Sequence, residues 1–361
     1  MKWPCNISVV KVHNFILNSI LLDPHFASYP PSAQYQKGFW KWTIENMERS
    51  QLASQSEADE FEIDERIYGH YLGLLPTSEP HGVPSDSENQ RKKPTLHQRP
   101  PSESYVTHYW QAIPARRGTD GLQGPMDLAH YQKVTLFESR RVIESGTTGL
   151  RTWRAGCVLA QYLAKHPDLV ESKRVLELGC GIGFMGAVTA AIQIRHWTED
   201  NDNGYQYGSL YLTDVNDDVL SRCRDNLRLA CNSSSSHPDI HVQTLDWFAS
   251  LDSYRERALV SLLDNEIKPN IVLGADIVFD PSLIPALTGV LKLVVSNSTG
   301  STHALIALTV RNETTVNSFM AHVREASLQI TEVLVGDTLT ESVNVSPAQD
   351  EEKVKLFRIT E

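Results

Sequence analysis

The sequence has 361 residues, a formal net charge of −11 at pH 7, 41% hydrophobic residues and 21% charged residues. This length allows one large domain or two smaller ones, and the composition is ordinary for a globular protein. A net negative chain argues against general, phosphate-driven binding to nucleic acid, which requires a basic face, and it suits a partner with basic patches. No run reaches the roughly 18 to 20 apolar residues that span a bilayer, so we expect no membrane contact.

Residues 1–75 show helical patterning. Apolar residues recur at helical spacing from Val9 to Ile20, and polar residues interrupt them before the apolar region of a signal peptide could form. Two aromatic-rich segments follow, one around Trp40 and one around Tyr68, and each fits an amphipathic helix. We therefore predict a helical N-terminal region.

The sequence then becomes polar and rich in proline. Residues 76–104 contain almost no large apolar side chains, so they cannot bury enough surface to offset the entropy of ordering, and we predict a disordered linker there. Residues 105–133 are predicted as a connecting segment, in which YVTHYWQAI is ordered and residues 118–124 form a loop.

The five cysteines are scattered, are odd in number and include no C-x-x-C pair. Free thiols in a reducing compartment explain this pattern best, so we expect a cytoplasmic protein. Cys223, Cys231, His237 and His241 are an alternative set of zinc ligands. Their spacing matches no standard zinc framework, so we expect no metal ion.

From residue 134 to the end of the chain, short apolar runs alternate with helical stretches. The predicted strands are Arg174–Leu178, Ser209–Thr213, Ile240–Leu245, Asn270–Ala275, Ala304–Val310, Leu328–Val335 and Lys353–Ile359. The predicted helices are Arg151–Lys165, Phe184–Ile194, Asp217–Leu229, Leu283–Val294 and Thr315–Ala326. Such alternation is typical of an α/β fold, so residues 134–361 are predicted to form a Rossmann-like, seven-stranded, largely parallel sheet with helices on both faces. Ligands of such sheets bind at the carboxyl ends of the strands.

The most informative segment is RVLELGCGIGFMGAVTAA, residues 174–191. A strand-like run leads into Gly179, Gly181 and Gly183, and a helix follows. Glycines let the backbone turn tightly and approach a ligand, and the helix beyond them offers unpaired N–H groups. In this strand–turn–helix context the segment predicts a cofactor site rather than a turn without a ligand.

Two classes of cofactor fit these glycines. Gly181, Gly183 and Gly186 satisfy the G-x-G-x-x-G pattern of dinucleotide-binding folds. Glu177, however, lies at the strand end, where a carboxylate would oppose a pyrophosphate but would suit the cationic amino-acid end of S-adenosyl-L-methionine. The next acidic strand end, Asp214, comes roughly thirty residues after Gly183, whereas the nicotinamide pattern expects about twenty. Both features favour S-adenosylmethionine.

Two further strand ends carry suitable side chains. Asp214 is placed to accept hydrogen bonds from both ribose hydroxyls, and the alternative is an N-cap for the helix that follows. Asp246 and Trp247 offer a carboxylate for the adenine amino group and an indole for its face. A tryptophan that only packs in the core is the alternative for Trp247.

Three more segments complete a pattern: SGTTGLRTWRAG (145–156), GADIVFD (274–280) and LTVRN (308–312). Together with VLELGCGIGFMG and LDW, they resemble the seven-β-strand, class I protein lysine methyltransferases called family 16. Within that family, the sequence is most similar to the branch that modifies translation elongation factor 2. That branch pairs its catalytic domain with a helical N-terminal region, and FWKWTIENME and YVTHYW match it here. The resemblance covers essentially the whole chain and is strongest from 134 to 312.

The resemblance implies a role for each matching residue. Trp153 would pack beside the cofactor at the mouth of the pocket, and Ala275 at the end of the fourth strand would also contact it. Glu177 and the three glycines would line the methionine side, Asp214 would hold the ribose, and Asp246 with Trp247 would hold the adenine. Asp276 and Phe279 have the D-x-x-F/Y form that the family places at the lysine channel.

The implied reaction is an in-line attack of a neutral lysine amine on the sulfonium methyl of S-adenosylmethionine. The protein then mainly aligns donor and acceptor and keeps the amine unprotonated. Asp276 would orient the amine and Phe279 would wall the channel, with a cation–π contact as a further role. The alternatives are a helix cap before Pro281 for Asp276 and core packing for Phe279.

The implied protein is a cytoplasmic monomer whose substrate is elongation factor 2. A non-catalytic binding module on the same fold is one alternative, but it would be expected to lack Glu177, Asp214 or Asp276, and all three are present. A methyltransferase for another protein lysine or for a small molecule is the other alternative, because substrate-side residues are not defined by this sequence alone.

Overall fold

The structure, a computed structural model, describes residues 3–4, 7–53, 61–75, 103–110, 128, 131–141, 143, 146–199, 208–296, 302–335 and 353–361. The chain forms two compact units. One comprises Met1–Val106 with Ala115–His130, and the other comprises Thr107–Pro114 with Tyr131–Glu361. The predicted linker at 76–104 lies outside the described residues, except for its last two.

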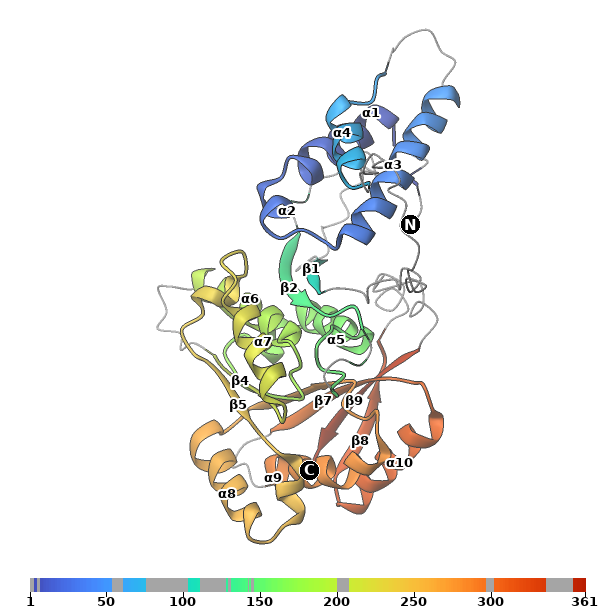
Figure 1. The fold of residues 1–361 in the computed structure, drawn as a ribbon. Helices are drawn as coiled ribbons and strands as arrows, with labels where there is room; N and C mark the ends of the chain where they lie inside the picture. Colours follow the sequence, from blue (N-terminus) through green and yellow to red (C-terminus); the bar gives the residue numbers. More distant parts are fainter. Residues whose placement is uncertain are drawn as a thin grey trace, which may run out of the picture. The chain divides into compact units, whose positions relative to one another are not determined.

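The N-terminal unit is helical, as predicted. Its helices are α1 (Val9–Ile16), α2 (Pro24–Ser28), α3 (Ala33–Ala53) and α4 (Glu65–Gly73), and a π-helical turn, Leu17–Leu21, extends α1 (Figure 1). Their apolar faces meet in a core of Val12, Ile16, Leu17, Trp40, Ile44, Met47 and Ile67. A buried polar contact also joins two helices, since Nε2 of His13 in α1 accepts a hydrogen bond from the backbone N–H of Asp64, the N-cap of α4 (3.1 Å).

The aromatic residues of α3 pack within this unit. Trp40 is buried and meets the ring of His70 edge-on, with ring centroids 5.1 Å apart. Phe39 lies between Tyr35, with which it stacks at 6.1 Å, and Trp42 at 6.5 Å. These rings therefore stabilise the helical unit itself. Of them, Tyr35 is the one that is half exposed (49%).

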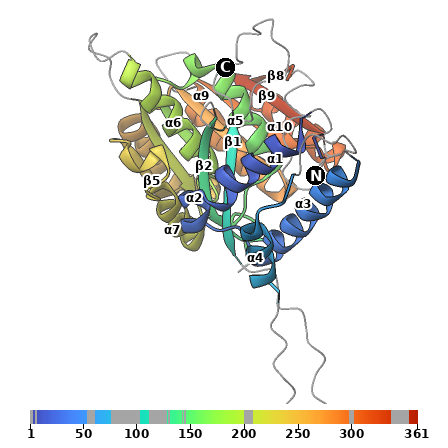
Figure 2. The same cartoon turned by 90° about the horizontal axis from the view of Figure 1, so that it is seen from above.

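The described strands of the larger unit form a seven-stranded sheet of order β5-β4-β3-β6-β7-β9-β8. The strands are β3 (Arg174–Leu178), β4 (Ser209–Asp214), β5 (Ile240–Thr244), β6 (Ile271–Ala275), β7 (His303–Thr309), β8 (Gln329–Val333) and β9 (Val354–Thr360). The first five strands of this order, from β5 through β4, β3 and β6 to β7, are parallel to one another. Strand β9 runs antiparallel to both β7 and β8. The turned view shows β5 and β8 at opposite edges (Figure 2). The predicted fold is confirmed, with small differences at the strand ends.

Helices cover both faces of this sheet. They are α5 (Arg154–Lys165), α6 (Phe184–Glu199), α7 (Asp217–Leu227), α8 (Arg255–Ser261), α9 (Ile284–Ser296) and α10 (Glu313–Glu325). Figure 1 shows α5, α6 and α7 on one side of the sheet and α8, α9 and α10 on the other. A hydrophobic core lies on each face of the sheet. Because side chains alternate along a strand, Val175 belongs to the core under α5, α6 and α7, and Leu176 belongs to the core under α8, α9 and α10. The inner strands β6 and β7, with the sequences IVLGA and HALIALT, are therefore almost entirely apolar, which explains their clear signal in the sequence.

Two elements were not predicted from the sequence. A separate two-stranded sheet pairs β1 (Ser104–Trp110) with β2 (Gln132–Glu138), whereas the sequence predicted only that the first of these segments is ordered. Helix α8 was also missed, because it is short and continues into a π-helical turn, Leu262–Ile267. Neither element has a periodic apolar pattern long enough to be recognised alone.

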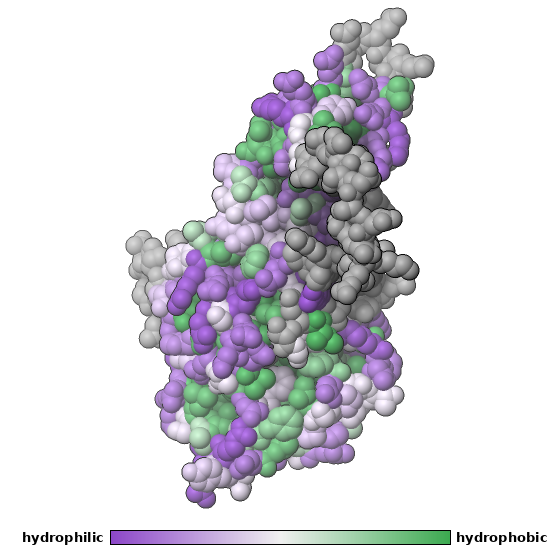
Figure 3. Space-filling view, viewed as in Figure 1, coloured by the Kyte–Doolittle hydropathy of each residue, from purple (hydrophilic) through white to green (hydrophobic). Residues whose placement is uncertain are grey.

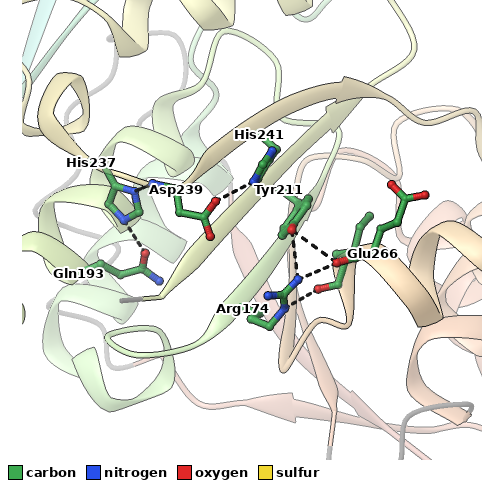
Figure 4. Close-up of polar contacts among 8 residues, drawn as sticks. Arg174, Gln193, Tyr211, His237, Asp239, His241 and Glu266 are labelled. Atoms are coloured by element: carbon green, nitrogen blue, oxygen red, sulfur yellow. Dashed lines mark hydrogen bonds and ion pairs between the residues drawn. The ribbon is translucent and has the colours of Figure 1, made fainter. Parts of the chain in front are cut away.

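A cluster of polar contacts lies at the start of β3, away from the carboxyl ends of the strands (Figure 4). The guanidinium of Arg174 donates to the carbonyls of Ile267 and Glu266 (both 2.7 Å) and to the hydroxyl of Tyr211 (3.1 Å). The ring of His241 stacks on Tyr211, with centroids 4.6 Å apart. Arg174 thus supplies partners to the last carbonyls of a helical turn, which is a structural role.

Candidate functional site

The predicted site residues come together at the carboxyl ends of four adjacent strands. Glu177 is the last residue but one of β3, Asp214 ends β4, Asp246 follows β5, and Ala275 ends β6 with Asp276 directly after it. The chain passes from β3 to β4 on one side and later returns to β6 on the other side of β3. Ligands of such sheets bind at the carboxyl edge, where the strand order changes direction in this way.

The loop after β3 requires glycine. Gly179, Gly181 and Gly183 all have positive φ, at +68°, +52° and +88°. A Cβ at Gly183 would lie 2.8 Å from Sγ of Cys223, and one at Gly181 would lie 3.1 Å from the carbonyl oxygen of Gly149. The backbone of this loop therefore approaches its neighbours too closely for any side chain. It is also held by hydrogen bonds, since the N–H of Gly181 donates to Oδ2 of Asp214 (3.3 Å) and the N–H of Gly183 donates to the carbonyl of Cys180 (3.0 Å).

Glu177 is a buried carboxyl group with an unsatisfied oxygen. It is 4% exposed, and its Oε2 has no hydrogen-bond partner among the described residues. Burial, together with the nearby charge of Asp214, raises the pKa of Glu177 to about 8, although a hydrogen bond from the backbone of Gly186 opposes the shift. A cation placed beside this carboxyl would supply the missing partner. The site therefore fits the ammonium end of S-adenosylmethionine.

Asp214 faces the glycine loop. Its Oδ1 accepts hydrogen bonds from the backbone N–H groups of Val215 (2.8 Å) and Asn216 (3.2 Å), and its Oδ2 accepts one from Gly181 (3.3 Å). Burial raises the pKa of Asp214 above its ordinary value. The N-cap of α7 is Asn216, so the alternative role of Asp214 as that cap is wrong.

Asp246 and Trp247 lie differently with respect to the loop. Trp247 packs against it, with Cζ2 3.6 Å from the position of a Cβ at Gly179. Both oxygens of Asp246 have protein partners, since Oδ1 accepts from the backbone of Phe248 (3.0 Å) and Oδ2 forms a close ion pair with Arg255. Asp246 therefore has a structural role at the turn after β5 in addition to any contact with a ligand.

Asp276 has an unusual backbone and at least one partner on each carboxylate oxygen. Its φ of +55° is rare for a residue other than glycine and is typical of functional sites. Its Oδ1 accepts from the backbone of Thr309 (2.7 Å), and its Oδ2 accepts from the Thr309 hydroxyl (2.8 Å) and from Arg311 (3.4 Å). The cap before Pro281 is Asp280, so Asp276 is not that cap. Phe279 is 55% exposed, which also rules out core packing for it.

Trp153 lies at the start of α5, where its indole Nε1 donates to the carbonyl of Thr148 (3.0 Å). The guanidinium groups of Arg151 and Arg311 lie 4.9 Å and 5.0 Å from the centre of its ring. Arg311 thus contacts both Trp153 and Asp276. Neither arginine has a role that can be predicted from the sequence, because LTVRN shows an arginine after a strand but does not show which residues it contacts.

The sequence predicts neither a metal ion nor contact with a membrane, and the described residues bear on both expectations. Among the described residues, no group of three or more His, Cys, Asp or Glu side chains is placed to hold a metal ion. None of the described helices is both long and apolar enough to cross a membrane. On the face shown in Figure 3, hydrophobic residues form small groups separated by polar ones.

Comparison with known proteins places the chain in a family. A sequence model of the family described as lysine methyltransferase matches residues 135–326, more than half of the chain. This chain therefore belongs to the lysine methyltransferase family. The predicted class, a methyltransferase that uses S-adenosylmethionine, is confirmed at the level of the family.

Individual relatives agree with this family. Protein-lysine N-methyltransferase EFM3 of Chaetomium thermophilum is 32% identical over 252 residues, which cover 67% of this chain and 65% of that protein. Protein-lysine N-methyltransferase EEF2KMT of Homo sapiens is 29% identical over 255 residues, which cover 67% of this chain and 69% of that protein. The chain spans about two thirds of the length of these two relatives.

Solved structures are more distantly similar. A putative S-adenosylmethionine-dependent methyltransferase from Streptococcus mutans has a TM-score of 0.37 at 10% identity, covering 63% of this chain and 52% of that chain. An O-methyltransferase from Bacillus cereus has a TM-score of 0.35 at 14% identity, covering 58% of this chain and 82% of that chain.

Proposed function

We propose that this protein transfers a methyl group from S-adenosylmethionine to a lysine side chain of translation elongation factor 2. The observation that carries the proposal is the buried, unsatisfied carboxyl of Glu177 beside a loop that only glycine can form. It lies in a chain of the lysine methyltransferase family. The names of the relatives, protein-lysine N-methyltransferases EFM3 and EEF2KMT, support a protein substrate and this particular factor.

The cofactor would lie along the carboxyl edge of β3, β4 and β5. Glu177 would receive its ammonium group, the glycine loop would pass beneath its methionine part, and Asp214 would accept the ribose hydroxyls. Trp247, which already packs on the loop, would contact the adenine face. Trp153 and Ala275 would close the side next to β6, and Asp246 would reach the adenine edge while keeping its own pairing with the chain.

The chemistry would take place beside Asp276. The cofactor supplies an electrophilic methyl group on a sulfonium sulfur. Oδ1 of Asp276 accepts one hydrogen bond from the protein and has a second lone pair, which can accept one from the lysine amine. That hydrogen bond would hold the amine in line with the methyl group. The exposed ring of Phe279 would form an apolar wall of the lysine channel and exclude water from it.

The positive charge of Arg311 favours the reaction at the same place. Its guanidinium forms an ion pair with Oδ2 of Asp276, at 3.4 Å. A guanidinium close to the channel also disfavours the ammonium form of an incoming lysine, and only the neutral amine is a nucleophile. We include a cytoplasmic monomer in the proposal, on the basis of free cysteines and of the composition.

The direct test incubates the purified protein with methyl-labelled S-adenosylmethionine, first with folded elongation factor 2 and then with a cell lysate. Labelling of a lysine on the factor is the expected result. Labelling of another lysate protein, with the factor unlabelled, contradicts the substrate. Binding of NAD in preference to S-adenosylmethionine contradicts the proposed cofactor and therefore the whole function.

A further inference from the structure

Two buried asparagines, one in the last turn of α7 and one shortly after this helix, form hydrogen bonds with the backbone of strand β2. Asn226 and Asn232 are 1% and 2% exposed. Oδ1 of Asn226 accepts from the N–H of Phe137 (2.7 Å), and its Nδ2 donates to the carbonyl of the same residue (3.3 Å). Asn232 makes the equivalent pair with Thr135, at 2.8 and 2.7 Å. Since Thr135 and Phe137 lie two residues apart, their backbone groups face the same side, and the two amides replace a neighbouring strand there.

The third side-chain hydrogen bond of Asn226 leads to the cofactor loop. Its Nδ2 also donates to the carbonyl of Ile182 (3.0 Å), between Gly181 and Gly183. Asn232 reaches no residue of this loop, and its remaining hydrogen bond goes to the backbone carbonyl of Asn226 (2.9 Å). The side-chain amide of Asn226 therefore joins β2 to the glycine loop, because its Oδ1 accepts from Phe137 while its Nδ2 donates to Ile182.

Strand β2 matters because of the residues that follow it. Glu138, its last residue, accepts from the N–H of Thr152 (2.8 Å). The N–H of Ser139 donates to the carbonyl of Leu150 (2.7 Å). These hydrogen bonds hold the segment 146–153, which ends at Trp153, against the end of β2. The same segment brings the carbonyl of Gly149 against Gly181 in the glycine loop. The loop and the Trp153 segment both belong to the proposed cofactor site. Asn226 bonds the loop directly and holds the Trp153 segment through β2.

We propose that Asn226 is a positioning residue for cofactor binding, which sets the glycine loop at the correct distance from the Trp153 segment by bridging Ile182 and Phe137. The inference rests on the proposed function only for the identity of the cofactor. An aspartate at this position has the same size but no donor, so its carboxylate would face two carbonyl oxygens in a buried site. The loop and β2 would then move apart.

The test compares Asn226→Asp with the matched control Asn232→Asp in the full-length protein. Both asparagines are buried and both hold β2, so both variants should unfold at lower temperature than the wild type. Calorimetric titration with S-adenosylhomocysteine, well below both unfolding temperatures, separates the two roles. We expect the affinity to fall about tenfold or more for Asn226→Asp and to stay within about twofold of the wild type for Asn232→Asp. Methyl transfer should show a raised KM for S-adenosylmethionine in Asn226→Asp, with kcat at saturation close to the wild type.

A milder variant, Asn226→Ser, covers the case in which Asn226→Asp does not fold. Serine retains a hydroxyl that is too short to reach both partners, so we expect the same direction of change. Wild-type affinity in folded Asn226→Ser or Asn226→Asp overturns the inference, and so does an equal loss of affinity in Asn232→Asp. A wild-type protein that does not bind S-adenosylhomocysteine contradicts the proposed function instead, which keeps the two failures distinguishable.

Discussion

At the scale of single residues, the carboxyl groups of the site differ in how many hydrogen-bond partners the protein gives them. Asp276 has partners on both oxygens, Asp214 accepts three backbone N–H groups, and Glu177 keeps one oxygen without a partner among the described residues. An unsatisfied buried carboxyl costs stability in the empty protein. A ligand that satisfies it is therefore bound more tightly than the contact alone would suggest.

Replacement of Asp214 by alanine should weaken cofactor binding. It removes charge-assisted hydrogen bonds to the ribose, each worth about 1.5 to 3 kcal/mol, so affinity for S-adenosylmethionine should fall about tenfold or more. Calorimetric titration measures the change. Asp218→Ala, at an exposed position in the first turn of α7, is the matched control and should bind normally. Unchanged affinity in a folded Asp214→Ala protein would contradict the assignment.

Replacement of Asp276 by asparagine should separate binding from chemistry. The variant should retain its affinity for the cofactor and lose methyl transfer by about a hundredfold, because the amine loses its charged acceptor. Single-turnover assays at saturating cofactor measure the loss. Asp280→Asn keeps the cap oxygen that accepts from Ser282 and should remain active. Turnover near wild type in Asp276→Asn would show that Asp276 only joins β6 to β7.

Cofactor binding near neutral pH should release a proton from Glu177. The pKa of Glu177 is about 8 in the empty protein, so the group is mostly protonated at pH 7, and an incoming ammonium group favours its ionised form. Calorimetry in two buffers of different ionisation enthalpy should show release of up to about one proton per cofactor bound. Glu177→Gln should abolish that release. Equal binding enthalpies in both buffers for the wild type would contradict the role of Glu177.

The same group affects stability in a defined direction. The folded pKa of Glu177 lies above its ordinary value, so the contribution of the protonated group is fully present at low pH. It is lost as pH rises from about 4.5, the ordinary pKa of the group, through about 8. A bound cation reverses this loss, so the difference in thermal stability between the empty and the bound protein should grow over that range.

At the scale of secondary-structure elements, hydrogen bonds between polar side chains connect an edge strand of the sheet to a helix that covers it. The N–H of Asp239, just before β5, donates to Nδ1 of His237 (3.2 Å), and Nε2 of His237 meets Gln193 of α6 (2.9 Å; Figure 4). Burial lowers the pKa of His237 to about 4, and the nearby carboxylate of Asp239 opposes the shift. This contact joins the turn before an edge strand to a helix that covers the sheet.

Stability should therefore depend on His237 in mildly acid solution. Its folded pKa is lower than its ordinary value, so its neutral form contributes stability that is fully present above about pH 6.5. This contribution is lost as pH falls towards about 4. Thermal denaturation between pH 7 and pH 4.5 should show a smaller decrease for His237→Gln than for the wild type. His241→Gln, whose side chain is half exposed, should follow the wild type. Parallel curves for all three proteins would contradict the role of His237.

At the scale of the whole molecule, the N-terminal unit has its own core and its aromatic residues largely fill it. Aromatic residues that anchor a protein substrate have to be exposed in the free protein. Trp40 is buried within the unit, and Tyr35 is a better candidate for such a contact because half of its surface is exposed. A contribution of this unit to recognition of elongation factor 2 remains a proposal.

A truncated protein tests that contribution. The structure places β1, with the buried Trp110, in the sheet with β2, so the truncated protein should begin at Glu103, before β1. We expect it to bind S-adenosylhomocysteine like the full-length protein and to methylate folded elongation factor 2 with a raised KM for that factor. Equal labelling of the factor by the two proteins would limit the N-terminal unit to a structural role.

The order and type of the main elements and the position of the cofactor loop are predictable from the sequence. Inner strands such as β6 and β7 are mainly apolar runs, and a turn through three glycines with positive φ leaves a local signature. What each carboxyl group contacts depends on the tertiary structure. Thr309 and Arg311 reach Asp276 from the next strand, more than thirty residues away along the chain. Asn226 joins the glycine loop to β2, which lies 89 residues before it. Such contacts depend on strand order and helix packing, and no local pattern of residues encodes them.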